Sequence, residues 1–351
     1  MAEMTSRQRV LAALRGQEHD RVPYMELYID EHFARRLLKL PPIDQPTPMS
    51  GTSPVTCAYF GGHSYDPLDL ARALDLDGLC VSIQPQIYFK TRLSQGQYFV
   101  VGGLIHKRDD IGIINLPDPD DERIYEPARQ FIERFRPHGY AIGCFINLGS
   151  DPVVLSMGWD HFSYALYDDP ELIQLMFDTY SDWYARALRH ICELGFDFIW
   201  AGDDIAFRSG PMISPRVFRD LFLPSYRRVA EAITLPWVFH TDGNFLLILE
   251  DLLSLGMDAL HPIEPDAVDI GEVKELVAGG VSLIGNIDIN ALSLSAPEEV
   301  EALTRDTIRR AALDGRFILS SSNSITRSCK VENVLAMIDA CRRYGKYPIT
   351  T

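Results

Sequence analysis

The segment PWVFHTDGN (236–244) carries the sharpest chemical signal in this sequence, because it places His240 and Asp242 two positions apart. Residues with that spacing on a strand point to the same side. An imidazole and a carboxylate on one side could bind a metal ion, and Glu264 or His261 would complete the three protein ligands of a catalytic zinc. In the structural alternative, Asp242 caps the next helix and His240 is a hydrogen-bonded pocket histidine. Spacing alone favours this alternative, because H-x-D is short and specifies no mechanism.

Two adjacent carboxylates, Asp203 and Asp204, end the preceding apolar segment in the tripeptide GDD. Repulsion between them would raise the pKa of one and prepare that group as an acid or a base. In the structural alternative, one carboxylate binds Arg208 or a backbone amide. We expect one of the two to be catalytic and the other to be structural.

Both pairs end short apolar segments that alternate with helical stretches, and this alternation predicts the fold. Most of the helical stretches begin at Ser, Asp or Pro, and several end at Gly, as helices do. The expected strands are 24–30, 78–84, 140–149, 196–204, 236–244, 257–265, 281–289 and 316–324. Strands that alternate with helices form parallel sheets, and eight such units in 351 residues fit a single (β/α)8 TIM barrel better than a doubly wound sheet.

The barrel is expected to fill residues 1–351 as one α/β domain, with an N-terminal helical extension over 1–23. Within that extension, SRQRVLAALRG (6–16) predicts a capped amphipathic helix that closes the floor of the barrel. The region GLIHKRDDIG (103–112), which follows YFVV (98–101), is typical of a hairpin inside one barrel loop.

The active site of such a barrel lies at the carboxyl ends of its strands, so the polar residues that end the predicted strands should converge on one pocket. They are Glu26, Asp30, Gln84, Asn147, Asp203, Asp204, His240, Asp242, Asn244, His261, Glu264, Asn286, Asp288, Ser322 and Asn323. The expected substrate-binding residues are Asn147, Asn244, Asn286, Asp288, Asn323 and Trp159. Trp159 belongs to an aromatic group that could line a mouth for a flat or methoxylated substrate, although aromatic side chains more often lie in a core. The near absence of Lys and Arg from the converging residues argues against a phosphorylated substrate.

Charge and composition exclude several classes of protein. The 33 Lys and Arg residues against 49 Asp and Glu residues give a formal net charge of −16, which argues against nucleic acid and anionic membranes as partners. The segment MAEMTSRQRVLAALRG has no long apolar core with a small-residue cleavage site, and no apolar segment approaches the ~20 residues of a membrane span. It also lacks a CxxC pair among its six cysteines and a G-x-G-x-x-G or Walker loop. We therefore expect a soluble cytoplasmic protein without a zinc ribbon or a nucleotide cofactor.

In the order in which they occur, the motifs SRQRVLAALRG…DRVPY, GDDIAFRSGPMISPRVFRDLFLP, FHTDGN, DALHPIEP, IGNID and ILSSSNSI resemble the uroporphyrinogen decarboxylase superfamily over nearly the whole chain. The resemblance implies a (β/α)8 barrel and a homodimer. It does not specify the reaction, because the superfamily contains cofactor-free porphyrinogen decarboxylases and corrinoid-linked methyltransferases.

Each branch of the superfamily has a motif that this sequence lacks. The decarboxylases grip the carboxylates of the substrate with an arginine-rich R-Q-A-G-R segment, which is missing after DRVPYMELYID, so a porphyrinogen would meet a repulsive acidic pocket. The methyltransferases hold zinc with H-x-C and a later Cys, which match His240, Asp242 and a position near Asn323. The loss of both thiolates argues against thiol activation, but a harder site of His240, Asp242 and Glu264 could bind zinc as a Lewis acid. His261 is a fourth candidate ligand.

Three functions are consistent with these observations. In the first, which we favour, the chain is a methyltransferase component that moves a methyl group from a small O- or N-methyl compound to a separate corrinoid protein. Zinc is then the Lewis acid, and Asp203 or Asp204 handles a proton. In the second, the chain is a metal-free decarboxylase or other lyase that acts on a small acid. In the third, it binds a ligand or a corrinoid partner without catalysis.

Overall fold

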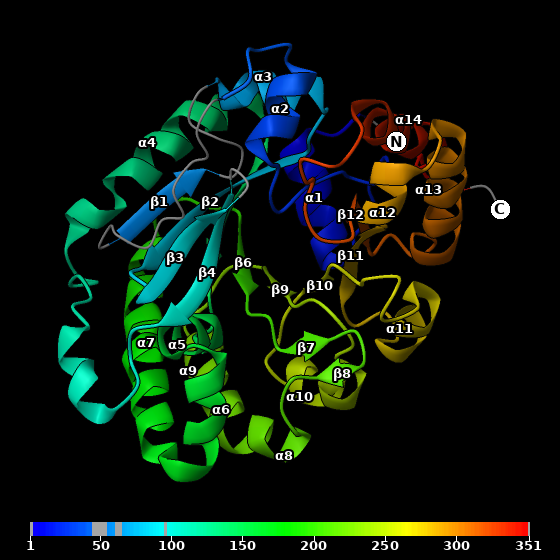
Figure 1. Ribbon diagram of the computed structural model, residues 1–351. Coiled ribbons are helices and arrows are strands. Elements are labelled where there is room, and N and C mark those ends of the chain that lie inside the picture. The colour runs from blue at the N-terminus through cyan, green and yellow to red at the C-terminus, as the bar shows by residue number, and fades with distance from the viewer. Residues whose placement is uncertain (1–2, 44–54, 60–64, 95–96, 350–351) are drawn as a thin grey trace.

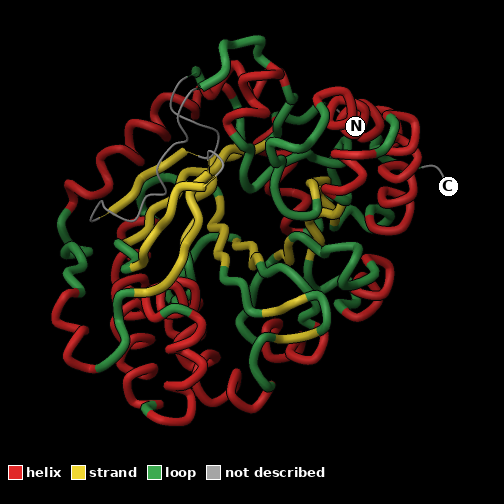
Figure 2. The backbone as a smooth tube through the Cα atoms, viewed as in Figure 1, coloured by secondary structure: helices red, strands yellow, loops and turns green. Residues whose placement is uncertain are grey.

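A curled β-sheet forms the centre of the molecule, and helices pack on its outer side (Figure 1, Figure 2). The structure is a computed structural model that describes residues 3–43, 55–59, 65–94 and 97–349. Its main sheet contains β1 (Val55–Tyr59), β2 (Gly78–Pro85), β5 (Ala141–Ile146), β6 (Phe198–Gly202), β9 (Trp237–His240), β10 (Ala259–His261), β11 (Ser282–Ile287) and β12 (Phe317–Ser321), in that order across the sheet. Neighbouring strands from β2 to β12 are parallel, whereas β1 is antiparallel to β2.

This sheet confirms the α/β class and the parallel strands that the sequence predicts. The seven parallel strands of the described residues coincide with the predicted strands from 78–84 to 316–324. Strand β1 lies outside every predicted strand, because VTCAY is a short segment and no helical stretch separates it clearly from its neighbours.

The first predicted strand, 24–30, differs from the expectation. It makes isolated parallel bridges instead of a continuous ladder, joining Tyr24 to Leu319 and Ile29 to Ile325. Between these bridges, the carboxylate of Glu26 accepts the backbone N–H of Ser321 at 2.9 Å. A side chain therefore takes the place of a backbone carbonyl in the ladder. The main sheet of the described residues thus contains seven parallel strands and the antiparallel β1, and not the eight parallel strands of the barrel that we expected.

Apolar residues of the strands pack on both faces of the sheet. In β6, Ile199 and Ala201 belong to the core between sheet and helices, whereas Phe198 and Trp200 belong to a second core inside the curl. This alternation follows from the two-residue period of a strand. The helix predicted over 6–16 forms as α1 (Ser6–Arg15), and it adds Val10, Ala13 and Leu14 to the inner core.

Of the other helices, α2 precedes β1, α14 follows β12, and the rest lie between the strands in sequence. They are α2 (Glu31–Leu37), α3 (Pro67–Ala73), α4 (Glu126–Phe135), α5 (Ser150–Met157), α6 (Trp159–Asp168), α7 (Pro170–Ile191), α8 (Pro215–Val217), α9 (Leu223–Ala230), α10 (Leu249–Leu253), α11 (Ile270–Leu276), α12 (Ile289–Leu294), α13 (Pro297–Ala311) and α14 (Val331–Tyr344). None of the helices in the described parts of the chain has the length and apolar character that a bilayer crossing requires.

Two antiparallel hairpins project from the loops. One pairs β3 (Phe89–Ser94) with β4 (Gln97–Gly103), and the other pairs β7 (Ala206–Phe207) with β8 (Gly210–Pro211). The hairpin expected within 98–112 therefore lies earlier in the chain, and Arg108–Ile113 form a 3-10 helix.

A buried carboxylate, Asp77, joins the start of β2 to the N-terminal residues. Asp77 is fully buried, and it accepts hydrogen bonds from Arg9 Nη1 at 2.6 Å, Arg21 Nη1 at 2.8 Å and the N–H of Tyr24 at 2.9 Å. Because Tyr24 begins the segment that contains Glu26, these contacts fix where Glu26 enters the sheet.

Asp77→Ala is expected to lower the free energy of unfolding by at least about 3 kcal/mol. The change removes one counter-charge from the buried guanidinium of Arg9, and it leaves the N–H of Tyr24 without its acceptor. Urea denaturation followed by circular dichroism measures this loss. The control is Asp69→Ala, since Asp69 is exposed and lies 3.9 Å from Arg72, a contact worth less than about 1 kcal/mol. Equal losses in the two variants would contradict the role given to Asp77.

Candidate functional site

The register of the parallel strands brings two histidines to the same level of the sheet. His240 ends β9, and it is paired with His261 at the end of β10 and with Gly202 at the end of β6. Both histidines lie two residues after an inner-core residue, so both imidazoles face the inside of the curl. Glycine at 202 leaves space for them, because a Cβ atom there would lie 3.3 Å from Cδ2 of His240 and 2.7 Å from the ring of Phe145.

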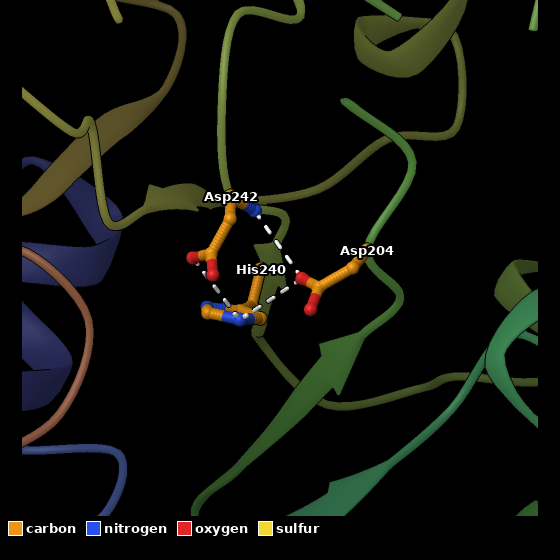
Figure 3. Close-up of side chains that lie close together, drawn as sticks. All are labelled: Asp204, His240 and Asp242. Atoms are coloured by element: carbon orange, nitrogen blue, oxygen red, sulfur yellow. Dashed lines mark hydrogen bonds and ion pairs between the residues drawn. The ribbon is translucent and has the colours of Figure 1, made fainter. Parts of the chain in front are cut away.

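Asp204, His240 and Asp242 form a compact cluster at the ends of β6 and β9, which we call the ligand group (Figure 3). The Nε2 atom of His240 lies 3.6 Å from Oδ1 of Asp204 and 3.7 Å from Oδ1 of Asp242. The N–H of Asp242 donates to Asp204 at 3.3 Å, and Nδ2 of Asn323 donates to Oδ2 of Asp242 at 2.5 Å. One imidazole nitrogen is therefore held between two carboxylates.

Burial and charge set the protonation of the ligand group. Burial raises the pKa of Asp242 to about 7, although the charge of His240 opposes this shift. Burial acts to lower the pKa of His240, but Asp204 and Asp242 outweigh it and raise that pKa above its usual value. Desolvation acts to raise the pKa of Asp204, and the contact with His240 reverses the shift and lowers it. A positive charge, whether a proton or a metal ion, is therefore favoured between the two carboxylates.

His261 lies directly behind His240, and the structure does not place it in the ligand group as we expected. Its Nδ1 atom is 2.7 Å from Nδ1 of His240, and its Nε2 atom is 3.4 Å from Oγ of Ser320. Its ring is fully buried and packs edge-on against Trp200, with ring centres 4.9 Å apart. Burial and the neighbouring His240 hold the pKa of His261 well below its usual value, so this imidazole is neutral.

Glu264 is the second expected ligand that lies outside the ligand group. Its Oε2 atom accepts the N–H of Gly243 at 2.7 Å, which holds the turn that follows Asp242. The compact cluster contains Asp204 in its place. The geometry therefore supports a ligand set of Asp204, His240 and Asp242 in place of the expected set with His261 and Glu264.

The two adjacent carboxylates after β6 have different surroundings. Asp203 is fully buried and accepts the N–H groups of Leu148 at 2.7 Å, Gly149 at 3.0 Å and Asp151 at 2.7 Å, so it binds the start of α5. Burial raises the pKa of Asp203 to about 7, against the effect of these hydrogen bonds. Asp204 instead faces the ligand group. This geometry favours a structural role for Asp203 and a chemical role for Asp204.

Asp151 is a candidate that the sequence reasoning missed. Its Oδ1 atom accepts the N–H of Asp204 at 3.0 Å. Burial, followed by the charges of Asp203 and Asp204, holds the pKa of Asp151 well above its usual range. The available signal was its position as the first acidic residue after the predicted strand 140–149.

Most of the expected substrate-binding residues bind the protein itself. Asn147 accepts a hydrogen bond from Gln84 at 2.7 Å and donates one to the carbonyl of Gly202. Asn244 accepts the N–H of Leu246 at 3.1 Å, and Asn286 accepts the hydroxyl of Thr307 at 3.3 Å. Asp288 accepts the N–H of Asn290 at 2.8 Å, at the start of α12. Trp159 lies next to the β3–β4 hairpin, where it lines a cavity of about 410 Å³. Among the described residues, those that line this cavity do not include the ligand group. Asn323 is the expected substrate-binding residue that contacts the ligand group directly.

The ligand group fits a metal ion. Among the described residues, the buried Oδ1 atom of Asp242 has no hydrogen-bond partner, and it faces Nε2 of His240. One potential ligand atom from each of the three residues lies within 4.8 Å of the others. One imidazole and two carboxylates are donors that zinc accepts. A cation at this place would satisfy the unpaired oxygen of Asp242.

The sequence of this chain is similar to a known protein family and to curated proteins. Residues 153–344 match the family model for uroporphyrinogen decarboxylase (URO-D). A methylated-thiol–coenzyme M methyltransferase of Methanosarcina mazei is 25% identical over 175 residues, which are 50% of this chain and 45% of that protein. A uroporphyrinogen decarboxylase of Burkholderia thailandensis is 25% identical over 187 residues, which are 51% of this chain and 49% of that protein. The chain spans about half the length of these curated relatives.

A solved structure described as a methyltransferase from Methanosarcina mazei has the same fold. It superposes with a TM-score of 0.72 at 18% identity, and the match covers 97% of this chain and 99% of that chain. The curled parallel sheet with outer helices is therefore a TIM-barrel-like fold of the kind found in these relatives.

Asp203→Ala is expected to lower the melting temperature more than Asp204→Ala. The first change leaves buried N–H groups of Leu148, Gly149 and Asp151 without an acceptor, at about 1–3 kcal/mol for each unsatisfied group. The second removes a partly exposed side chain. Differential scanning calorimetry of both variants measures the difference, and a larger loss in Asp204→Ala would show that the two carboxylates are assigned the wrong way round.

Proposed function

The chain belongs to the uroporphyrinogen decarboxylase family, and we propose that it is a methyltransferase that moves a methyl group from a small O- or N-methyl compound to a corrinoid protein, with zinc as the Lewis acid. One observation carries the proposal, namely the ligand group, in which an imidazole nitrogen and two carboxylates can share one cation. The relative named as a methyltransferase supports this class of reaction.

The residues of the site match the needs of such a transfer. When a methyl group leaves a heteroatom for a nucleophile, the bonding electrons stay on the heteroatom, which then takes up a proton. Asp204, His240 and Asp242 would hold a zinc ion, which would supply Lewis-acid polarisation of that heteroatom. The pKa of Asp151, which lies beside Asp204, is raised well above its usual range, and we assign to Asp151 the supply of the proton that the leaving heteroatom takes up.

Protein purified without chelators is expected to contain close to one zinc per chain by elemental analysis. His240→Ala and Asp242→Ala should each lose the metal, because each removes one of three ligands. Asp288→Asn is the control, since Asp288 caps α12 and should leave the zinc content unchanged. Wild-type protein without zinc, also after incubation with zinc, would overturn the metal site.

The zinc-loaded protein is expected to transfer methyl groups to cob(I)alamin from at least one member of a panel of O- and N-methyl compounds, as followed by cobalamin absorbance. His240→Ala should lower the rate more than about 100-fold, because Lewis-acid stabilisation of a transition state is worth several kcal/mol. Asp288→Asn should keep the wild-type rate. A zinc-loaded wild type that is inactive with every donor would count heavily against methyl transfer.

A second candidate function is the metal-free decarboxylation of a small acid, the class of reaction named for the second relative. One observation favours it, because the raised pKa of His240 lets this imidazole keep a proton between two carboxylates. The carbanion left by decarboxylation takes up a proton. Metal-free wild-type protein that consumes its substrate, together with an inactive His240→Ala, would favour this candidate over methyl transfer.

A further inference from the structure

A buried row of polar side chains runs from the segment 24–30 to the ligand group. It contains, in order, Glu26, Ser320, His261 and His240, and we call it the relay. The hydroxyl of Ser320 donates to Oε2 of Glu26 at 3.2 Å, and the ring of His261 bridges Ser320 at 3.4 Å and His240 at 2.7 Å. Each member is no more than 7% exposed, so water does not compete freely for these contacts.

Glu26 sets the polarity of the relay, by which we mean the direction in which each of its hydrogen bonds is donated. Burial raises the pKa of Glu26 to about 7, so its carboxyl is ionised above that pH, and an ionised carboxylate accepts hydrogen bonds and donates none. Glu26 accepts the N–H of Ser321 at 2.9 Å, the hydroxyl of Ser321 at 2.6 Å and the hydroxyl of Ser320. Ser320 has one hydroxyl proton, and that proton points to Glu26. Its oxygen is therefore left to accept a hydrogen bond from Nε2–H of His261.

The remaining links follow from this polarity. A neutral His261 with its proton on Nε2 has a lone pair on Nδ1, and that lone pair accepts Nδ1–H of His240. A neutral His240 with its proton on Nδ1 has its lone pair on Nε2. This is the atom that lies 3.6 Å and 3.7 Å from the carboxylates of Asp204 and Asp242.

We infer that Glu26 is a positioning residue, which acts through the relay to keep the Nε2 lone pair of His240 available to a cation in the ligand group. The value of that lone pair to the protein rests on the proposed zinc function. If Glu26 were a donor, every link would reverse, and a proton would occupy Nε2 of His240. The proton would then exclude a metal ion from that nitrogen.

Glu26→Gln tests the inference, because it replaces an acceptor oxygen by a donor of nearly the same shape. The backbone N–H of Ser321 requires an acceptor, so the amide oxygen should occupy the position of Oε1. The amide nitrogen then takes the position of Oε2 and donates to Ser320. The relay should reverse, and His240 should carry its proton on Nε2.

The direct readout is the position of that proton in metal-free protein. Nitrogen-15 NMR of histidine-labelled protein distinguishes protonated from unprotonated ring nitrogens, and the signals of His240 are those that His240→Ala removes. Spectra are recorded at alkaline pH, where His240 is neutral. We expect the proton on Nδ1 in the wild type and on Nε2 in Glu26→Gln. An unchanged proton position in Glu26→Gln would overturn the inference.

A second readout is zinc affinity, measured by competition with a chelator. We expect Glu26→Gln to weaken it about 10–100-fold, the effect usual for a residue that orients a metal ligand. If the wild type binds no zinc, the proposed metal function fails. The proton position in metal-free protein still tests the relay in that case, so the two failures are distinguishable.

A matched pair of serine variants provides the control. Ser320→Ala and Ser321→Ala each remove one buried hydroxyl from the same oxygen of Glu26, but Ser320 is the one that contacts His261. Ser320→Ala should leave His240 with a mixture of proton positions, whereas Ser321→Ala should keep the wild-type position. Equal effects of the two variants would overturn the relay. Thermal unfolding checks that each variant is folded, and the serine pair carries the test if Glu26→Gln does not fold.

Discussion

The hydrogen bond between the Nδ1 atoms of His240 and His261 is the contact on which the rest of the site depends. Two ring nitrogens 2.7 Å apart require one proton between them, so the state of each imidazole fixes the state of the other. The pair exists because β9 and β10 are in register and because Gly202 leaves space beside the ring of His240. A shift of either strand by one residue would turn one histidine towards the helices and separate the pair.

The carboxylates around this pair are stabilised in three ways. Asp203 is surrounded by backbone N–H groups, Asp151 has a raised pKa, and Asp204 and Asp242 share a positively charged neighbour. Each arrangement offsets the cost of moving a negative charge away from water. Since the third arrangement needs a cation, the same electrostatics that stabilise the fold also prepare the site to bind one.

Much of the fold could be predicted from the sequence, and so could the end of the sheet at which the polar residues gather. The parallel strands are apolar segments that end in polar residues, and the carboxyl ends of parallel strands converge, which correctly brought His240, Asp242 and Asn323 together. The family resemblance is confirmed by the match over 153–344. These features depend on residue pattern alone.

The finer geometry depends on information that the pattern does not contain. Asp203 and Asp204 point in different directions because β6 stops at Gly202, and a pattern does not resolve a strand end to one residue. The ring of His261 faces Nδ1 of His240 and not the carboxylates of Asp204 and Asp242, which follows from the register of β9 and β10. Trp159 lies on a different cavity because the β3–β4 hairpin covers that part of the chain.

The segment 24–30 has a consequence for motion. In the described residues this segment makes one isolated bridge to β12, at Leu319, and one to Ile325 beyond that strand, and the carbonyl of Tyr24 accepts the N–H of Asp77 beside β2. A stretch of backbone with so few ladder hydrogen bonds opens locally at a lower free energy than the regular strands beside it, and its amide protons exchange sooner with solvent. Glu26 lies within this segment of the backbone. A local opening of the segment 24–30 would therefore take the acceptor away from Ser320 and disturb the hydrogen bonds that lead to the two histidines.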